Sequence, residues 1–71
     1  MPKTYTPKKV IAKYKNLGFV EDRQSGSHKI FYHPTTKQRA VIPFHLKELP
    51  KGTLSAILRE SQVSKKDFEE T

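Results

Sequence analysis

The 71-residue sequence has no cysteine, no tryptophan, one methionine and three glycines. Without cysteine the chain has neither a disulfide framework nor a thiolate metal site, and three histidines alone are a poor set of structural zinc ligands. The longest apolar run, residues 40–44, is far shorter than the roughly 20 residues that span a bilayer. No apolar signal-peptide segment follows the basic N-terminus. We therefore expect a cytoplasmic protein that does not associate with membranes.

Acidic residues are also scarce, since seven Asp and Glu stand against fourteen Lys and Arg for a net charge of +7. The surplus lies in residues 1–51, which hold eleven basic and three acidic side chains. A strongly basic domain favours a polyanionic partner, with nucleic acid ahead of an acidic protein or a membrane surface. We therefore expect the basic surface to belong to the N-terminal two thirds of the chain.

Several enzyme classes lack their motifs in this sequence. No glycine-rich nucleotide loop and no Gly-x-Ser-x-Gly nucleophile motif occurs, and the few carboxylates do not cluster as a two-metal nuclease requires. RNA allows a mechanism without metal, because its own 2′-OH attacks the adjacent phosphorus once a base takes the proton. If the protein is a nuclease, one histidine and nearby cations therefore suffice for RNA but not for DNA.

Apolar periodicity and turn residues predict a single α+β domain over residues 1–71, with a loose lead-in at 1–5. The predicted elements are a helix over 7–17, strands over 19–23, 28–33 and 38 or 39–43, a loop over 44–51, a helix from 52–53 and a last helical turn opened by Ser64. The order α-β-β-β-α fits a three-stranded antiparallel sheet with two helices on one face and the other face free for function. Alternation along 28–33 is mixed, so it does not decide which face is buried.

His28 is the strongest candidate for chemistry, because it follows a Gly26-Ser27 turn through which a phosphate can approach the backbone. The residues alone also fit an ordinary surface histidine in a turn. Lys29 and Arg39 flank the predicted sheet and are candidate phosphate contacts. We expect His33 and His45 to have structural roles, at a strand end and in a loop. A metal site formed by the three histidines has no supporting ligand spacing.

Lysines on the predicted first helix, including Lys9 and Lys13, would add salt-dependent affinity for RNA. The competing interpretation is that these lysines only keep a small domain soluble.

Five blocks of sequence, in order, resemble the HicA (YcfA-like) family of toxin mRNA interferases over residues 7–68. They are Leu17-Gly18-Phe19-Val20, Gly26-Ser27-His28-Lys29-Ile30-Phe31-Tyr32-His33-Pro34, Val41-Ile42-Pro43-Phe44-His45, Glu48-Leu49-Pro50-Lys51-Gly52-Thr53-Leu54 and Ile57-Leu58-Arg59. Each block is weak alone, and their combination at these spacings is specific.

The resemblance implies a fold like that of double-stranded-RNA-binding domains and an endoribonuclease activity on mRNA, with His28 as the catalytic residue. From the scattered carboxylates and the missing nucleotide motifs we expect no metal or small-molecule cofactor. The resemblance also implies neutralisation by a HicB-type antitoxin, and we expect a monomer when the antitoxin is absent. The lysine pair that opens the last helix of those RNA-binding domains is replaced here by Gly52-Thr53, so single-stranded mRNA is the expected substrate. The alternatives are a non-catalytic RNA-binding module and a module that binds only an acidic protein.

Overall fold

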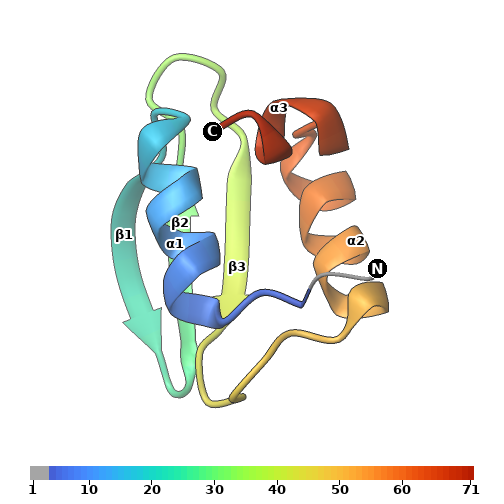
Figure 1. Cartoon of the computed structure of the whole chain (residues 1–71). Coiled ribbons are helices and arrows are strands. Elements are labelled where there is room, and N and C mark those ends of the chain that lie inside the picture. The colour runs from blue at the N-terminus through green and yellow to red at the C-terminus, as the bar shows by residue number, and fades with distance from the viewer. Residues whose placement is uncertain (1–3) are drawn as a thin grey trace.

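The computed structural model describes residues 4–71 and has an α+β fold (Figure 1). Its elements are α1 (Pro7–Asn16), β1 (Val20–Ser25), β2 (His28–Tyr32), β3 (Arg39–Pro43), α2 (Lys51–Ser61) and α3 (Lys65–Glu69). The strands form one antiparallel sheet in the order β1-β2-β3. The predicted α-β-β-β-α order with a short C-terminal helix is therefore confirmed.

Helix α1 begins and ends where its sequence signals predict. The Thr6 side chain accepts a hydrogen bond from the Lys9 backbone N–H at 3.1 Å, and Pro7 occupies the first turn, where a missing N–H costs nothing. After Asn16 the chain leaves the helix through Leu17 and Gly18, and Gly18 has φ +100°, a value that L side chains avoid. The glycine thus ends the helix and redirects the chain into the sheet.

The β1–β2 hairpin is tighter than predicted. The strand predicted over 19–23 leaves residues 24–27 for the connection, but β1 continues to Ser25 and only Gly26 and Ser27 connect the strands. Gly26 has φ +60°, as two-residue hairpin loops require of their first residue. Ser25 therefore pairs with His28, so this histidine begins a strand directly at the turn.

The two faces of the sheet differ in burial along β2 and β3, whereas β1 is exposed throughout. Phe31 from β2 and Ala40 and Ile42 from β3 face the helices and are almost fully buried. The opposite side, which we call the open face, exposes Val20, Tyr32 and Val41 by 41%, 37% and 42%. Figure 1 shows α1 lying over the sheet roughly along its strands, and α2 beside β3. The structure thus settles the question that strand alternation left open.

One hydrophobic cluster joins the sheet to all three helices. Its buried members are Val10, Tyr14, Phe19, Phe31, Ala40, Ile42, Leu49, Ile57, Leu58 and Phe68. Helix α2 begins at Lys51, slightly earlier than predicted, after Pro50, which cannot supply a side-chain cap. Helix α3 begins as predicted, because the Ser64 hydroxyl accepts from the Asp67 N–H at 3.0 Å and Phe68 enters the core.

The structure tests only part of the prediction that residues 1–5 form a loose lead-in. Residues 1–3 lie outside the described residues. Tyr5, however, is held by a backbone bridge, in which the Leu49 N–H donates to the Tyr5 carbonyl at 2.8 Å, and its ring packs edge-on against Phe68 at 5.2 Å. The prediction was therefore wrong for Tyr5, because its aromatic side chain has a partner distant in sequence. Within residues 4–71, none of the helices has the length and apolar character to cross a bilayer.

Candidate active site

His28 lies on the open face at the first position of β2. Its register partners are Ser25 in β1 and Pro43 in β3, and its side chain is exposed. Within residues 4–71 no hydrogen bond or ion pair engages its imidazole. The ring is therefore accessible to a ligand on the face that the helices leave uncovered.

A second histidine stands beside it. The ring centroids of His28 and His45 are 6.0 Å apart, with an interplanar angle of 61°. His45 lies in the bend that follows β3, two residues after Pro43, and its proximity to the His28 ring places it beside the open face. The intervening Phe44 N–H donates to the Ser27 carbonyl at 3.0 Å, which fixes the start of this loop against the hairpin turn. The fold thus forms a pair of imidazoles from positions 17 residues apart.

Sequence reasoning missed this pair, because it placed His45 in a loop with a structural role. The available signal was the register of β2 and β3, which sets Pro43 opposite His28. That register depends on the length of the β2–β3 connection, and periodicity alone does not give it.

Two arginines accompany the histidines on the open face. Arg23 pairs with Ile30, in the row of side chains next to His28, while Arg39 pairs with Tyr32 at the far end of β2. Arg39 also contacts Asp22, with 3.7 Å between Nη1 and Oδ2, and 63% of its side chain stays exposed. Arg23 was not singled out from the sequence, because the register shift between Glu21 and Arg23 that fixes its side has no sequence signature.

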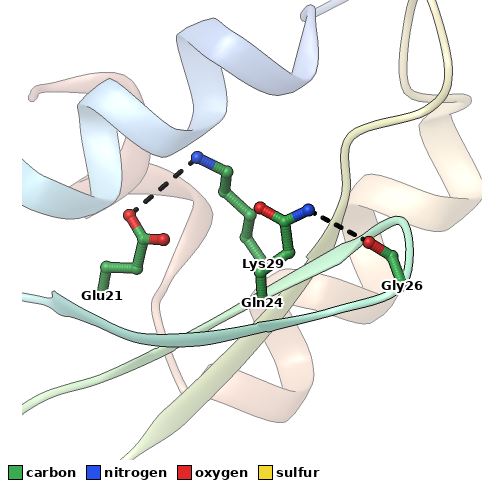
Figure 2. A network of polar contacts seen from close by, with 4 residues as sticks. All are labelled: Glu21, Gln24, Gly26 and Lys29. Atoms are coloured by element: carbon green, nitrogen blue, oxygen red, sulfur yellow. Dashed lines mark hydrogen bonds and ion pairs between the residues drawn. The ribbon is translucent and has the colours of Figure 1, made fainter.

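Lys29 occupies the opposite side of the sheet from His28. Its Nζ lies 3.9 Å from Glu21 Oε1 and 5.6 Å from the centre of the Phe44 ring. Figure 2 shows the ion pair on the side of the hairpin that faces α1. The structure therefore does not bring Lys29 together with His28, although the two are adjacent in sequence, since neighbouring strand residues point to opposite faces.

The turn residues serve mainly to shape the hairpin. The Gly26 carbonyl accepts from the Gln24 side-chain amide at 3.2 Å (Figure 2), and the space where a Gly26 side chain would stand is open. Ser27 supplies the carbonyl that Phe44 binds. A ligand has room to approach the turn next to His28.

Lys9 and Lys13 lie on α1, on the helix side of the sheet. The Lys13 ammonium donates to the carbonyls of Phe68 at 3.2 Å and Thr71 at 2.9 Å, so it holds the C-terminal turn. Lys9 is exposed beside a cavity of about 840 Å³ that Lys13, Lys51 and Lys65 also line. The structure does not bring either lysine to the histidine pair.

His33 has the structural role that the sequence predicts. Its Nδ1 accepts from the backbone N–H groups of Thr35 and Thr36 at 3.1 and 3.2 Å, which orders the β2–β3 turn. Its ring packs edge-on against Phe19 and passes so close to Gly18 that a Cβ there would lie 2.7 Å from Nε2. Among residues 4–71 no group of three His, Cys, Asp or Glu side chains has the arrangement of a metal site.

These features define a class: a small basic α+β domain with helices on one face of its sheet and exposed histidines and arginines on the other. A family model described as the HicA toxin of bacterial toxin-antitoxin systems matches residues 7–63. The chain belongs to the HicA toxin family, as the sequence blocks indicated, and membership implies an antitoxin partner. No curated protein matched the chain.

Proposed function

We propose that this HicA-family protein is a metal-independent endoribonuclease that cleaves single-stranded mRNA, with His28 transferring the proton. The observation that carries the proposal is the position of His28, an exposed imidazole without a competing partner among the described residues, on the sheet face opposite the core. Membership of a toxin family supports an activity that harms the host cell.

The chemistry uses the nucleophile that RNA itself provides. The 2′-oxygen attacks the adjacent phosphorus, the bond from phosphorus to the 5′-oxygen breaks, and the products end in a 2′,3′-cyclic phosphate and a 5′-hydroxyl. An imidazole in hydrogen-bond reach removes the 2′ proton or protonates the leaving oxygen. Arg23 is the nearest open-face cation to His28 in the strand register and would stabilise charge on the phosphate.

The rest of the open face suits a single strand of RNA. Tyr32 offers an exposed ring on which a base can stack, and Arg39 lies directly opposite it in the sheet. Val20 and Val41 flank this ring with apolar surface. A strand that runs along β2 would thus place its phosphates near the cations and its bases on Tyr32.

The antitoxin that family membership implies is, in this proposal, of the HicB type. The same apolar side chains of the open face, Val20, Tyr32 and Val41, would be covered by it, which would block access to His28. The free toxin would be a monomer.

The test compares the wild type with His28→Ala on a defined mRNA in the presence of EDTA. We expect wild-type cleavage that leaves 2′,3′-cyclic phosphate ends, and a loss of at least about 100-fold in the variant. The thermal midpoint should not change, because an exposed histidine contributes little to stability. Glu48→Gln, an exposed change in the loop after β3, is the matched control.

Two results would contradict the proposal. RNA that is bound but left intact by the wild type would indicate a non-catalytic RNA-binding module. Cleavage that EDTA abolishes, or 3′-hydroxyl ends, would indicate a metal-dependent mechanism.

A further inference from the structure

We propose that His45 is the second proton-transfer group of the reaction, so that His28 and His45 act as an acid–base pair on one phosphate. This inference rests on the proposed ribonuclease function and deepens it. The juxtaposition that carries it is the 6.0 Å separation of the two ring centroids on the open face.

Both imidazoles are exposed, and within residues 4–71 neither forms an ion pair or a side-chain hydrogen bond with another residue. This distinguishes them from His33, whose ring nitrogen is already occupied by two backbone N–H groups. The pair therefore keeps its donors and acceptors available for a ligand.

The backbone around the pair is fixed on both sides. The β2–β3 ladder sets Pro43 opposite His28, and the hydrogen bond from Phe44 to Ser27 ties the next residue to the hairpin turn. The Phe44 ring lies on the other side of the sheet beneath the Lys29 ammonium. His45 is thus directed to the open face by a partly buried neighbour and a backbone bond, which is the support that a catalytic side chain needs.

Cleavage of RNA requires two proton transfers on opposite sides of the phosphorus. One imidazole takes the proton from the 2′-OH as the bond from the 2′-oxygen to phosphorus forms. The other gives a proton to the 5′-oxygen as its bond to phosphorus breaks. Each ring must come within about 3 Å of its oxygen, and two adjacent exposed rings reach two oxygens of the same phosphate without a change of backbone.

The charged groups around the two histidines are compatible with one ring acting as the base and the other as the acid. Arg23 lies on the open face of β1 opposite Ile30, in the row of side chains next to His28, and Lys47 and Glu48 follow His45 in the loop. Lys29 points to the opposite side and pairs with Glu21. Within the described residues no carboxylate forms an ion pair with either ring.

The experiment measures cleavage of two RNA substrates by the wild type, His28→Ala, His45→Ala, His45→Gln and the control Glu48→Gln. One substrate is ordinary, and the other has sulfur in place of the 5′-oxygen at the scissile bond. A thiolate leaves without a proton, so this substrate does not need the general acid. Thermal denaturation of each variant confirms that it is folded.

We expect both His45 variants to cleave the ordinary RNA about 10²- to 10⁴-fold more slowly than the wild type, as removal of a general acid or base does. On the sulfur substrate one histidine variant should recover to within about tenfold of the wild type while the other does not. The variant that recovers lacks the acid. The pH profile of the wild type should be bell-shaped, and His45→Gln should lose one limb.

Three outcomes overturn the inference. A His45→Ala variant that cleaves ordinary RNA at the wild-type rate shows that the second ring is dispensable. Equal deficits of the His28 and His45 variants on both substrates show that His45 only positions His28. If the wild type itself leaves both substrates intact, the ribonuclease function fails as well, and this result is distinguishable from the first two.

Discussion

Tyr14 forms the main polar contact inside the core. Its hydroxyl lies 2.6 Å from Ser61 Oγ, and Ser61 Oγ also donates to the Ile57 carbonyl at 2.8 Å. Burial raises the pKa of Tyr14 above its ordinary value of 10.0, and the hydrogen bond with Ser61 opposes this shift. The neutral phenol is therefore the form that the folded state favours.

Removing this hydroxyl in Tyr14→Phe should lower the free energy of unfolding at pH 7 by about 1 kcal/mol, because Ser61 keeps its bond to Ile57. Above pH about 10 the unfolded phenol ionises while the folded one does not, so the wild type loses about 1.4 kcal/mol per pH unit until the raised pKa is passed. The difference between wild type and variant should then shrink. Urea unfolding at pH 7 and pH 11 measures it, and a constant difference would contradict the assignment.

At the scale of elements, glycines in the hairpin and in α2 should respond oppositely to the same substitution. Gly26→Ala places an L side chain at φ +60° and should destabilise the protein by about 1 kcal/mol, although the space beside it is open. Gly52→Ala lies in the first turn of α2, also in open space, and should stabilise by about 0.5 kcal/mol. Thermal midpoints of the two variants test this, and equal signs would contradict it.

One basic residue on each face of the sheet provides a matched pair of charge variants. Arg23 is on the open face and Lys29 on the helix side, and each change to glutamine removes one positive charge. If RNA binds the open face, Arg23→Gln should weaken binding and reduce the salt slope by about 0.7, the value for one phosphate contact in a single strand. Lys29→Gln should change the slope less. Fluorescence titrations with RNA at several salt concentrations compare them, and a larger effect of Lys29 would place the RNA elsewhere.

Local signals predicted most element boundaries. Thr6-Pro7 and Ser64 mark helix starts, and glycine marks the end of α1. The errors fall where long-range pairing decides: β1 extends to Ser25 because the ladder with β2 continues to the turn. The candidate site shows the same difference. His28 was predicted from the turn that precedes it, whereas the proximity of Arg23 and His45 to it depends on strand register.

At the scale of the whole molecule, Phe68 joins the C-terminal turn to the core. It is 1% exposed, packs against Tyr5 and Tyr14, and its carbonyl accepts from the Lys13 ammonium. It also lies beyond residues 7–63, which the family model matches. The match of the family model alone therefore does not show that this residue belongs to the core.

Phe68→Ala should lower the free energy of unfolding by about 3–5 kcal/mol, which is a large part of the 5–15 kcal/mol that stabilises an ordinary domain. We expect a marked drop in the thermal midpoint and loss of toxicity through unfolding. Phe68→Leu keeps most of the apolar volume and should lose clearly less. If Phe68→Ala lowers the free energy of unfolding by less than about 1 kcal/mol, as measured by urea unfolding, α3 is peripheral to the core.

The interpretation of residues 1–71 as one domain stays a prediction.

The alternation along β2 has a genetic consequence. His28, Ile30 and Tyr32 point to the open face, while Lys29 and Phe31 point to the helices. If the chain is toxic to its host, a selection for surviving cells should recover inactivating substitutions of two kinds. Those at Phe31 should yield little intact protein, and those at His28 and Tyr32 should accumulate to normal levels. Survivors sorted by protein abundance would then place Phe31 in the low group and its neighbour Tyr32, together with His28, in the normal group.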